Sequence, residues 1–379
     1  MQILVLGGTG AMGLPLVQQL SAAGHAVTVT TRQKLPPQQL LGLPNISFAI
    51  GNSKNITFLE SILKREQWQA IVDFMSWGGM FERIVSLMLN NTEQYVFISS
   101  ARVYSQSEEL ITEETPRLLD VSEDKAFLKT NEYALAKARA ENILRDSGNN
   151  NYTIIRPSIT YNDYRLQLGV FEKEGWLYRA LHGRSIVFSQ DLADKLTTMT
   201  LGDDVATCIA SIIGKDEALG QTFHTTVSES LLWSEVLTIY LNVLRVHLGH
   251  EVNVVMTDKS TNFIFPGLKY QLIYCRYFNR TFDNSKIGKF TDVGNFTSAA
   301  EGLTRCLNNF LRQPKFRPIK WSLEGVNDRV AGEWTPLNEI PKLADKLTYV
   351  CYRIHLEFIY SLMRRIKILL KKIWVLINV

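Results

Sequence analysis

The residues with the clearest chemical potential are a tyrosine and a lysine near the middle of the chain. Tyr133 and Lys137 are four residues apart in the helical stretch Glu132–Arg145, so their side chains share one face of a helix. At a separation of about 5 Å and an effective dielectric constant near 20, the lysine charge stabilises a tyrosinate by roughly 3 kcal/mol, or about two pKa units. We therefore expect Tyr133 to exchange a proton with a substrate hydroxyl near neutral pH.

Ser100 adds a hydroxyl to this pair. It follows the apolar run Gln94–Ile98, which predicts a strand, and open α/β sheets bind ligands at the carboxyl ends of their strands. Its hydroxyl can hold a substrate oxygen during hydride transfer. The alternative is that a tyrosine and a lysine at this spacing are ordinary helix decoration, but the serine at a strand end favours catalysis. Thr130 or Asn131 is expected to cap the helix.

A glycine-rich loop near the start of the chain has the spacing of a phosphate-binding turn. It lies between the apolar run Gln2–Leu6 and the amphipathic stretch Ala11–Ala23. A missing side chain lets backbone N–H groups approach a pyrophosphate, and a helix N-terminus attracts the phosphates. The alternative is a purely structural turn, which this position between strand and helix disfavours. The residues expected to contact a dinucleotide are Gly7, Thr9, Gly10, Ala11, Met12 and Gly13.

The end of the second predicted strand discriminates between the two nicotinamide dinucleotides. NAD-selective sites place a carboxylate here, which accepts hydrogen bonds from ribose hydroxyls. This chain instead has Thr30-Thr31-Arg32-Gln33-Lys34. Because arginine forms charge-assisted hydrogen bonds with a 2′-phosphate, Arg32 favours NADP(H) over NAD(H) as the cofactor. The alternative is that Arg32 is a solvated loop cation.

The hydrophobic pattern predicts the elements that must position these residues. Short apolar runs alternate with amphipathic stretches, which is typical of a doubly wound parallel sheet. Further strands are expected at Ala26–Thr30, Ile46–Ile50, Ala70–Phe74 and Tyr152–Ile155. Further helices are expected at Phe58–Arg65, Phe81–Leu89, Asp204–Ile213, Leu231–Leu248 and Ser298–Leu311. The last begins with the capping box Ser298-x-x-Glu301.

This pattern predicts an α/β chain with a Rossmann-type sheet, a smaller C-terminal substrate domain and a basic helical tail. The nucleotide-binding domain is expected over residues 1–163, and part of 199–250 is expected to return to it. An interleaved substrate-binding domain is expected over 164–320, followed by a C-terminal extension over 321–379.

Composition narrows the possible classes of protein. The chain has 379 residues, 46% hydrophobic and 21% charged, as in an ordinary globular protein. Its four cysteines are far apart, so neither a metal site nor a disulfide framework is expected. Residues 342–379 hold eight Lys or Arg against two acidic residues, which leaves the rest of the chain slightly acidic. No nucleic-acid partner is therefore expected for the body of the chain.

In order and spacing, several motifs resemble the extended branch of the short-chain dehydrogenase/reductase family, also called the NAD-dependent epimerase/dehydratase family. The resemblance covers residues 1 to about 315 and implies nucleotide-sugar substrates. It implies Ser100, Tyr133 and Lys137 as catalytic residues, and Pro157 beside the nicotinamide carboxamide. It rests on the glycine loop, Ser99-Ser100-Ala101-Arg102-Val103-Tyr104, Tyr133-Ala-Leu-Ala-Lys137, Ile155-Arg156-Pro157, Asp283-Asn-Ser-Lys286 and Glu301-Gly302-Leu303.

Departures from the family pattern narrow the expected reaction. Ala101 and Arg102 stand where dehydratases and decarboxylases of the family carry an acid, so 4,6-dehydration is disfavoured. The reactions that remain as expectations are epimerisation at one carbon and reduction of a keto sugar.

Two further departures lie near the expected adenosine site. Asn52 replaces the usual aspartate after the third strand, where we still expect a cofactor contact, and residues 73–77 replace the usual His-x-Ala-Ala. Four cations can clamp a nucleotide diphosphate, although a solvated role is the default for each: Arg165, Arg184, Lys195 and Arg280.

The basic tail lies outside the resemblance. Its apolar residues alternate with cations, and it has no uncharged run of the roughly 20 residues that span a bilayer. Peripheral contact of residues 342–379 with an anionic membrane surface is one expectation. The alternative is a helix that packs on its own domain, on a second subunit or on a glycosyltransferase.

These observations predict an NADP(H)-dependent nucleotide-sugar epimerase or keto-sugar reductase with Tyr133 as its acid/base. A role in surface polysaccharide biosynthesis and a homodimeric state are expected. Because the N-terminus lacks a basic region and a long apolar run, a cytoplasmic location is expected, with peripheral contact at the inner membrane face. The alternative is a non-catalytic dinucleotide-sensing or RNA-binding member of the same fold. The retained Ser100, Tyr133 and Lys137 favour the enzyme.

Overall fold

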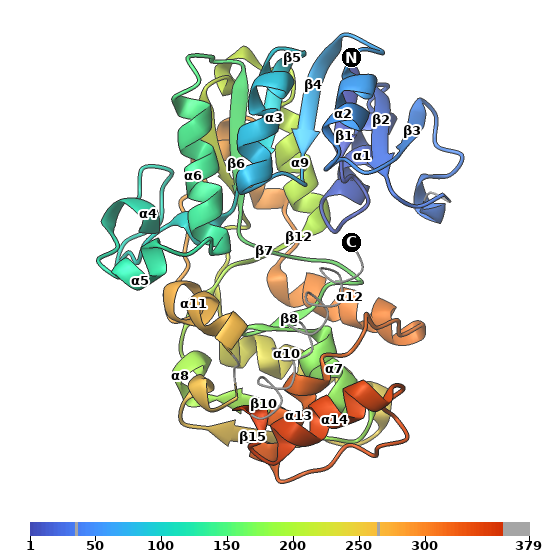
Figure 1. Ribbon diagram of the computed structural model, residues 1–379, viewed down its shortest axis with the longest axis vertical. Coiled ribbons are helices and arrows are strands. Elements are labelled where there is room, and N and C mark those ends of the chain that lie inside the picture. The colour runs from blue at the N-terminus through green and yellow to red at the C-terminus, as the bar shows by residue number, and fades with distance from the viewer. Residues whose placement is uncertain (35–36, 264–265, 359–379) are drawn as a thin grey trace, which may run out of the picture. The chain divides into compact units, whose positions relative to one another are not determined.

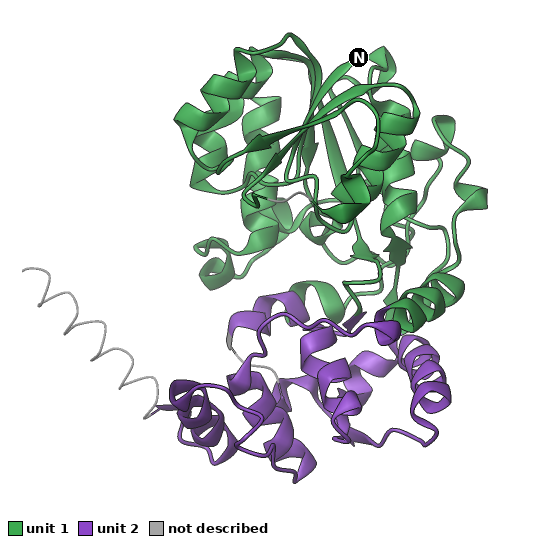
Figure 2. Cartoon of the chain, turned by 90° about the vertical axis from the view of Figure 1, so that its right-hand side faces the viewer, with its two compact units in different colours: residues 1–166, 196–232, 273–309 green, residues 167–195, 233–272, 310–379 purple. Residues whose placement is uncertain are grey.

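The chain divides into two compact units in the computed structural model, which describes residues 1–34, 37–263 and 266–358 (Figure 1). Unit 1 comprises residues 1–166, 196–232 and 273–309 (Figure 2). Unit 2 comprises residues 167–195, 233–272 and those from 310 onward.

Unit 1 is built on a seven-stranded parallel sheet with the strand order β13-β6-β5-β4-β1-β2-β3. The central strands are almost continuous apolar runs, because helices cover both faces of the sheet. The strands are β1 (Gln2–Leu6), β2 (Ala26–Thr31), β3 (Ile46–Ile50), β4 (Trp68–Asp73), β5 (Thr92–Ile98), β6 (Tyr152–Pro157) and β13 (Gln221–Thr225).

Different sets of helices cover the two faces of the sheet (Figure 1). Alternate residues of a strand point to opposite faces, so Ile3 packs with α1 (Gly13–Ala22) and α9 (Gly202–Ile212). The next residue, Leu4, packs on the other face. The helices of that face are α2 (Ile56–Leu63), α3 (Gly79–Leu89) and α6 (Tyr133–Arg145). This arrangement confirms the predicted doubly wound α/β class.

The other elements of unit 1 are short except for α12 (Ala299–Arg312), whose last residues, from 310, belong to unit 2. The hydroxyl of Ser298 accepts a hydrogen bond from the backbone N–H of Glu301 at 3.2 Å, as the capping box predicts. The small elements are β7 (Ile159–Tyr161), β11 (Leu196–Thr197), β12 (Met199–Leu201), β14 (Leu231–Leu232), α4 (Leu118–Val121), α5 (Lys125–Leu128), η2 (Ala101–Val103), η1 (Gln38–Leu40), η3 (Asp216–Ala218), η7 (Ile287–Lys289) and η8 (Val293–Asn295).

Unit 2 is mainly helical and holds a buried ion-pair cluster. The guanidinium of Arg179 lies 2.9 Å from Glu324 and 2.7 Å from Asp328, and all three side chains are buried. Its elements are β8 (Gln167–Leu168), β9 (Phe171–Glu172), β10 (Ile186–Ser189), β15 (Val254–Thr257), α7 (Lys173–Leu181), α8 (Gln190–Ala193), α10 (Trp233–Leu248), α11 (Lys269–Gln271), α13 (Trp321–Ala331), α14 (Leu343–Arg353), η4 (Ser260–Asn262) and η5 (Pro266–Leu268). A π-helical turn, η6 (Leu272–Arg276), lies where the chain passes back into unit 1.

Several elements were not expected from the sequence, among them β13, α7 and α13. Strand β13 is an edge strand with the mixed sequence QTFHT, so it lacks the apolar run by which the other strands were predicted. Helix α7 buries Lys173 and Arg179, and these charged residues make the segment resemble a polar loop in the sequence. Arg179 pairs with distant acidic residues, whereas Lys173 pairs with the adjacent Glu174. Helix α13 likewise buries Glu324 and Asp328.

The division into units also differs from the expected domain boundaries. Residues 273–309 belong to unit 1, whereas the sequence pattern placed them in a domain over 164–320. Backbone pairing with a distant loop explains this: the N–H of Ile111 donates to Thr281 at 2.8 Å, and the N–H of Asp283 donates to Ile111 at 3.0 Å. The described residues 310–358 belong to unit 2, so the unit boundary lies near residue 310 and not at the expected 321.

Helix α14 is the described part of the basic tail. Residues 359–379, which contain most of its cations, lie outside the described residues. Among the residues that the structure describes, no helix has both the length and the apolar character to cross a membrane.

Candidate dinucleotide and active site

The glycine loop leaves open space where a diphosphate would approach. Gly7 has a backbone φ of +80°, which favours glycine. A Cβ atom on Gly13 would lie 2.7 Å from the Cα of Gly8, so the start of α1 packs directly on the loop. At Gly10, by contrast, a Cβ atom would meet nothing within 4 Å. The glycines therefore provide both close helix packing and an open backbone face, which fits a dinucleotide.

The start of α1 also suits an anion. Met12 precedes its first turn without a side-chain cap, and the first turn holds no acidic residue. Backbone N–H groups at such a helix end favour a negatively charged group. The loop itself is held in place, because the N–H of Gly7 donates to Thr30 Oγ1 at 3.1 Å and Ser53 Oγ donates to the same oxygen at 2.8 Å.

The predicted adenosine side lies after β2 and β3. Arg32 follows β2 with an exposed side chain, as an arginine that binds a 2′-phosphate requires. Asn52 follows β3 and is also exposed, and its side-chain oxygen accepts a hydrogen bond from the N–H of Lys54 at 3.1 Å. Pro157 is the last residue of β6 and is buried beside its partner in the sheet, Thr225.

The structure brings Ser100, Tyr133 and Lys137 together. Ser100 is buried after β5, and Tyr133 is the first residue of α6. Ser100 is close enough to Tyr133 to be among the groups that lower the pKa of this tyrosine. The ammonium of Lys137 lies 5.9 Å from the centre of the Tyr133 ring. The sequence spacing thus predicted one hydroxyl pair with a cation beside it, and the fold assembles it.

The pKa of Tyr133 does not follow the sequence expectation. Burial raises it above its ordinary value, and this outweighs the effect of nearby cations. The cations that lower it are first Arg102 and then Arg165, whereas we expected Lys137 to have this effect. The two-unit acidification calculated from the sequence is therefore not met, because it took no account of burial.

The ammonium group of Lys137 is hydrogen-bonded to the protein backbone. Its Nζ donates to the carbonyl oxygens of Ile98 at 2.6 Å and Ser76 at 3.0 Å. Burial lowers the pKa of this lysine to about 8, although Asp73 and Glu141 act in the opposite direction. The ammonium therefore joins the ends of β5 and β4 to helix α6.

This lowered pKa of Lys137 predicts a pH-dependent contribution to stability. Between pH 8 and 10.5 the unfolded chain binds more protons at this site than the folded chain, so the stability of the wild type relative to Lys137→Met rises with pH. Below pH 8 both states are protonated and the full penalty of burying the charge is present. The shift corresponds to about 3 kcal/mol. Urea unfolding of both proteins from pH 7.5 to 10 measures it, and a constant difference would contradict the assignment.

The helix cap of α6 differs from the expected one. Glu132, rather than Thr130 or Asn131, is the N-cap: its carboxylate accepts a hydrogen bond from the N–H of Ala134 at 2.6 Å. Thr130 acts one step earlier, accepting from the N–H of Glu132 at 3.2 Å. Glu132 also forms an ion pair with Arg102. The choice of cap therefore depends on a residue 30 positions away.

A buried ion-pair cluster around Glu141 holds helix α6 in place next to the site. Glu141, one turn after Lys137, accepts hydrogen bonds from Ser99 Oγ at 2.6 Å and from Arg156 at 2.7 Å and 2.9 Å. Arg117 adds a further contact at 3.2 Å. Glu141 thus ties α6 to the ends of β5 and β6. Glu141 was not singled out from the sequence. Its i, i+4 spacing from Lys137, which places both side chains on the same face of α6, was the signal that could have identified it.

Trp77 forms part of the rim of the site. Its ring lies edge-on to Tyr133 at 5.8 Å and remains 42% exposed. The turn before it is fixed by Asp73, which accepts hydrogen bonds from the N–H groups of Met75 at 2.7 Å and Ser76 at 3.0 Å. The residues that depart from the family pattern after β4 therefore have a structural role beside Tyr133.

The four cations proposed as a diphosphate clamp lie in different surroundings. Arg165 is half-buried near Tyr133, and Lys195 is half-buried in unit 2. Arg280 is buried and donates to the carbonyl oxygens of Ser105 and Tyr104, each at 3.0 Å.

The fourth cation, Arg184, lies in the buried ion-pair cluster of unit 2, 3.0 Å from Glu324 and 3.1 Å from Glu339. Arg184 and Arg280 therefore bind protein groups.

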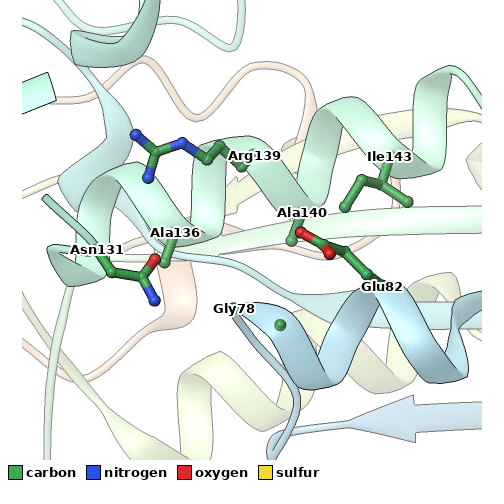
Figure 3. Close-up of a pocket in the computed structure, with 8 residues that line it drawn as sticks. Gly78, Glu82, Asn131, Ala136, Arg139, Ala140 and Ile143 are labelled. Carbon is green, nitrogen blue, oxygen red and sulfur yellow. The ribbon is translucent and has the colours of Figure 1, made fainter. Parts of the chain in front are cut away.

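A surface pocket lies between the start of α3 and α6 (Figure 3). Its lining set does not include Ser100, Tyr133 or Lys137. The lining residues are Gly78, Gly79, Glu82, Asn131, Ala136, Arg139, Ala140 and Ile143. In the described part of the chain, no three His, Cys, Asp or Glu side chains are grouped so as to hold a metal ion, and the four cysteines are free thiols.

A family model described as NAD(P)H-binding matches residues 7–199, more than half of the chain. The chain belongs to this NAD(P)H-binding family. The match contains the glycine loop and the Ser100, Tyr133 and Lys137 cluster. It confirms the predicted family and a nicotinamide dinucleotide as the class of cofactor.

Curated relatives of this NAD(P)H-binding protein differ in their stated functions. A chloroplast stem-loop binding protein of 41 kDa from Arabidopsis thaliana is 28% identical over 59% of this chain, and the match spans 58% of the Arabidopsis protein. A 2′-dehydrokanamycin reductase from Streptomyces kanamyceticus is 24% identical over 67% of this chain and 69% of its own length.

Among solved structures, a UDP-glucuronic acid 4-epimerase from Bacillus cereus shares the fold with a TM-score of 0.61. The superposition covers 83% of this chain and the whole of that chain, at 16% identity. This similarity extends the shared fold beyond the family match at residues 7–199.

Proposed function

We propose that this protein is a nicotinamide-dependent epimerase or keto-sugar reductase that acts on a nucleotide sugar. The observation that carries the proposal is the placement of Tyr133, the first residue of α6, with Ser100, which follows β5 at the carboxyl edge of the sheet, where the glycine loop also lies. Open α/β sheets bind ligands at this edge, so a substrate hydroxyl there would meet both residues.

The proposed division of roles follows from the contacts. When bound, a nicotinamide supplies a hydride acceptor or donor. Tyr133 moves the proton of the substrate hydroxyl, and Ser100 orients the same oxygen through its own hydroxyl. Lys137 holds the first turn of α6 against the carbonyls of Ser76 and Ile98, which keeps Tyr133 in place. Residues of the glycine loop would hold the diphosphate.

The residue types around Tyr133 favour reactions that need one proton and one hydride. Arg102 occupies the position where a second acid would stand, and its only charged partner in the described ion pairs is Glu132. Elimination of water needs an additional proton donor beside the hydride site. We therefore propose epimerisation or reduction in preference to 4,6-dehydration. The relative named as a reductase supports this choice.

The experiment that tests this function is a turnover assay on the purified full chain. Candidate nucleotide sugars such as UDP-glucose and UDP-glucuronic acid are supplied with NAD(H) or NADP(H), and formation of an epimer or of a reduced sugar is followed. Turnover by the wild type and its loss in Tyr133→Phe would support the proposal. Equal turnover by both proteins would refute it.

RNA binding is a second candidate function, because the Arabidopsis relative is named a stem-loop binding protein. Under this alternative the dinucleotide site is a sensor, and the hydroxyl pair is not needed for activity. Gel-shift titration of a stem-loop RNA against the same purified chain distinguishes the two. Tight, saturable RNA binding without sugar turnover would favour the second candidate.

We further propose NADP(H) as the preferred cofactor, on the basis of the exposed Arg32 at the end of β2. Arg32→Asp is expected to raise the dissociation constant of NADPH by about 10- to 100-fold, because it replaces a charge-assisted contact with repulsion of the 2′-phosphate. The dissociation constant of NADH is expected to change little.

Fluorescence titration of both cofactors measures the effect of Arg32→Asp. The matched control is Arg65→Asp, which changes another exposed arginine of unit 1 and should leave both dissociation constants unchanged. An equal loss of NADPH and NADH affinity in Arg32→Asp would contradict the assignment.

A further inference from the structure

The ion pair between Arg102 and Glu132 lies directly beside Tyr133. We propose that Arg102, held by Glu132, is the cation that stabilises the phenolate of Tyr133 when this tyrosine gives its proton to the substrate. Arg102 is then a positioning residue that acts through Tyr133. The inference rests on the proposed function only in taking Tyr133 as the acid/base.

The backbone places Arg102 next to the hydroxyl pair. Ser100 caps the short turn η2, its Oγ accepting a hydrogen bond from the N–H of Arg102 at 3.2 Å. The side chain of Arg102 then reaches over the tyrosine ring, with its Cζ atom 5.3 Å from the ring centre. The serine of the proposed site thus also positions the residue that carries the charge.

Glu132 fixes the guanidinium in this position. It forms an ion pair with Arg102, and the two side chains are 14% and 20% exposed. Its other carboxylate oxygen caps α6 by accepting from the N–H of Ala134. Since Tyr133 is the next residue along the chain, the cap, the ion pair and the phenol form one local unit.

Lys137 is less suited to this electrostatic role. Its ammonium lies at 5.9 Å from the ring centre and donates to two backbone carbonyls. Burial lowers its pKa to about 8, so its charge is being lost in the range where a tyrosine would ionise. A guanidinium stays protonated throughout that range, so the charge of Arg102 is available whenever the phenolate forms.

The charged groups that face Tyr133 come from several elements. The charge of Arg102 from η2 and that of Arg165, after β7, lower the pKa of Tyr133. Glu132, at the cap of α6, raises it. Lys137 faces the ring from the next turn of α6. Removing the charge of Arg102 should therefore raise the pKa of Tyr133.

Direct titration of Tyr133 tests the inference without any substrate. The probe is the full chain labelled with ring-¹³C tyrosine, with NAD⁺ added, and the Tyr133 resonance is assigned by its loss in Tyr133→Phe. In Arg102→Gln the titration midpoint is expected to rise by about one unit or more. In Arg102→Lys, which keeps a positive charge, it should stay closer to the wild type.

Two variants keep the test decisive if Arg102→Gln does not fold. Arg102→Met removes the same charge with an unbranched apolar side chain and is expected to raise the midpoint as Arg102→Gln does. Lys137→Gln is expected to shift the midpoint less than either variant. An unchanged midpoint in Arg102→Gln or Arg102→Met, or a larger shift in Lys137→Gln, would overturn the inference. Loss of sugar turnover in Tyr133→Phe is a separate readout, so the proposed function and this inference can fail independently.

Discussion

Tyr133→Phe is expected to lower turnover of a nucleotide sugar by about 100- to 10,000-fold, the usual contribution of a positioned acid/base. The substitution removes only the hydroxyl, whose pKa is affected by Ser100. The ring, which packs against Trp77 at 5.8 Å, is retained. Cofactor affinity should therefore change little, because the glycine loop is untouched. Steady-state assays and a fluorescence titration of NADPH measure the two effects.

Tyr164→Phe is the matched control for Tyr133→Phe. Tyr164 is also in unit 1, but its side chain is 51% exposed, so removal of its hydroxyl should change neither turnover nor cofactor affinity. If Tyr133→Phe instead lost cofactor binding and turnover together, the tyrosine would have a structural role.

Glu141→Gln is expected to lower the free energy of unfolding by about 3 kcal/mol or more at pH 7. The fully buried carboxylate of Glu141 balances Arg156 and Arg117, and removal of one partner leaves buried positive charge without compensation. Burial alone would raise the pKa of Glu141, but the charge and hydrogen bonds of Arg156 lower it below its ordinary value. Urea unfolding followed by circular dichroism measures the loss.

The pH dependence of this loss follows from the lowered pKa of Glu141. The stabilising contribution is fully present above the ordinary pKa of about 4.5 and disappears as the pH falls through the lower value in the folded state. The difference between wild type and Glu141→Gln should therefore shrink on acidification. Glu60→Gln, at an exposed position of α2, is the control and should unfold as the wild type does. A loss of stability as small as that of this control would show that the buried cluster does not stabilise the fold.

Local patterns predicted most of the fold of unit 1. Strands β1 to β6 and the helices beside them were expected within a few residues, because covered parallel strands are apolar runs and the helices have one apolar face. The glycine loop and the Ser100, Tyr133 and Lys137 set were predicted from the same local patterns. Each of these residues either directly follows a predicted strand or lies in a predicted helix, so its position in the fold follows from its neighbours in the sequence.

Contacts between distant residues could not be predicted in this way. Arg280, expected as a surface clamp, donates to the carbonyl of Tyr104, which is 176 positions earlier in the chain. Glu132 replaces the expected cap because its carboxylate also meets Arg102, 30 positions away. Local rules compare residues within about one helical turn, so they do not reach such pairs.

The sequence by itself determined the parallel sheet, the phosphate-binding loop and the identity of the hydroxyl pair, since each depends on residue type and short spacing. The tertiary structure decided the electrostatics of that pair. Burial raises the pKa of Tyr133, and Arg102 and Arg165 oppose it in place of the expected Lys137. Charge effects depend on distance and on exclusion of water, and both are set only when remote segments pack together.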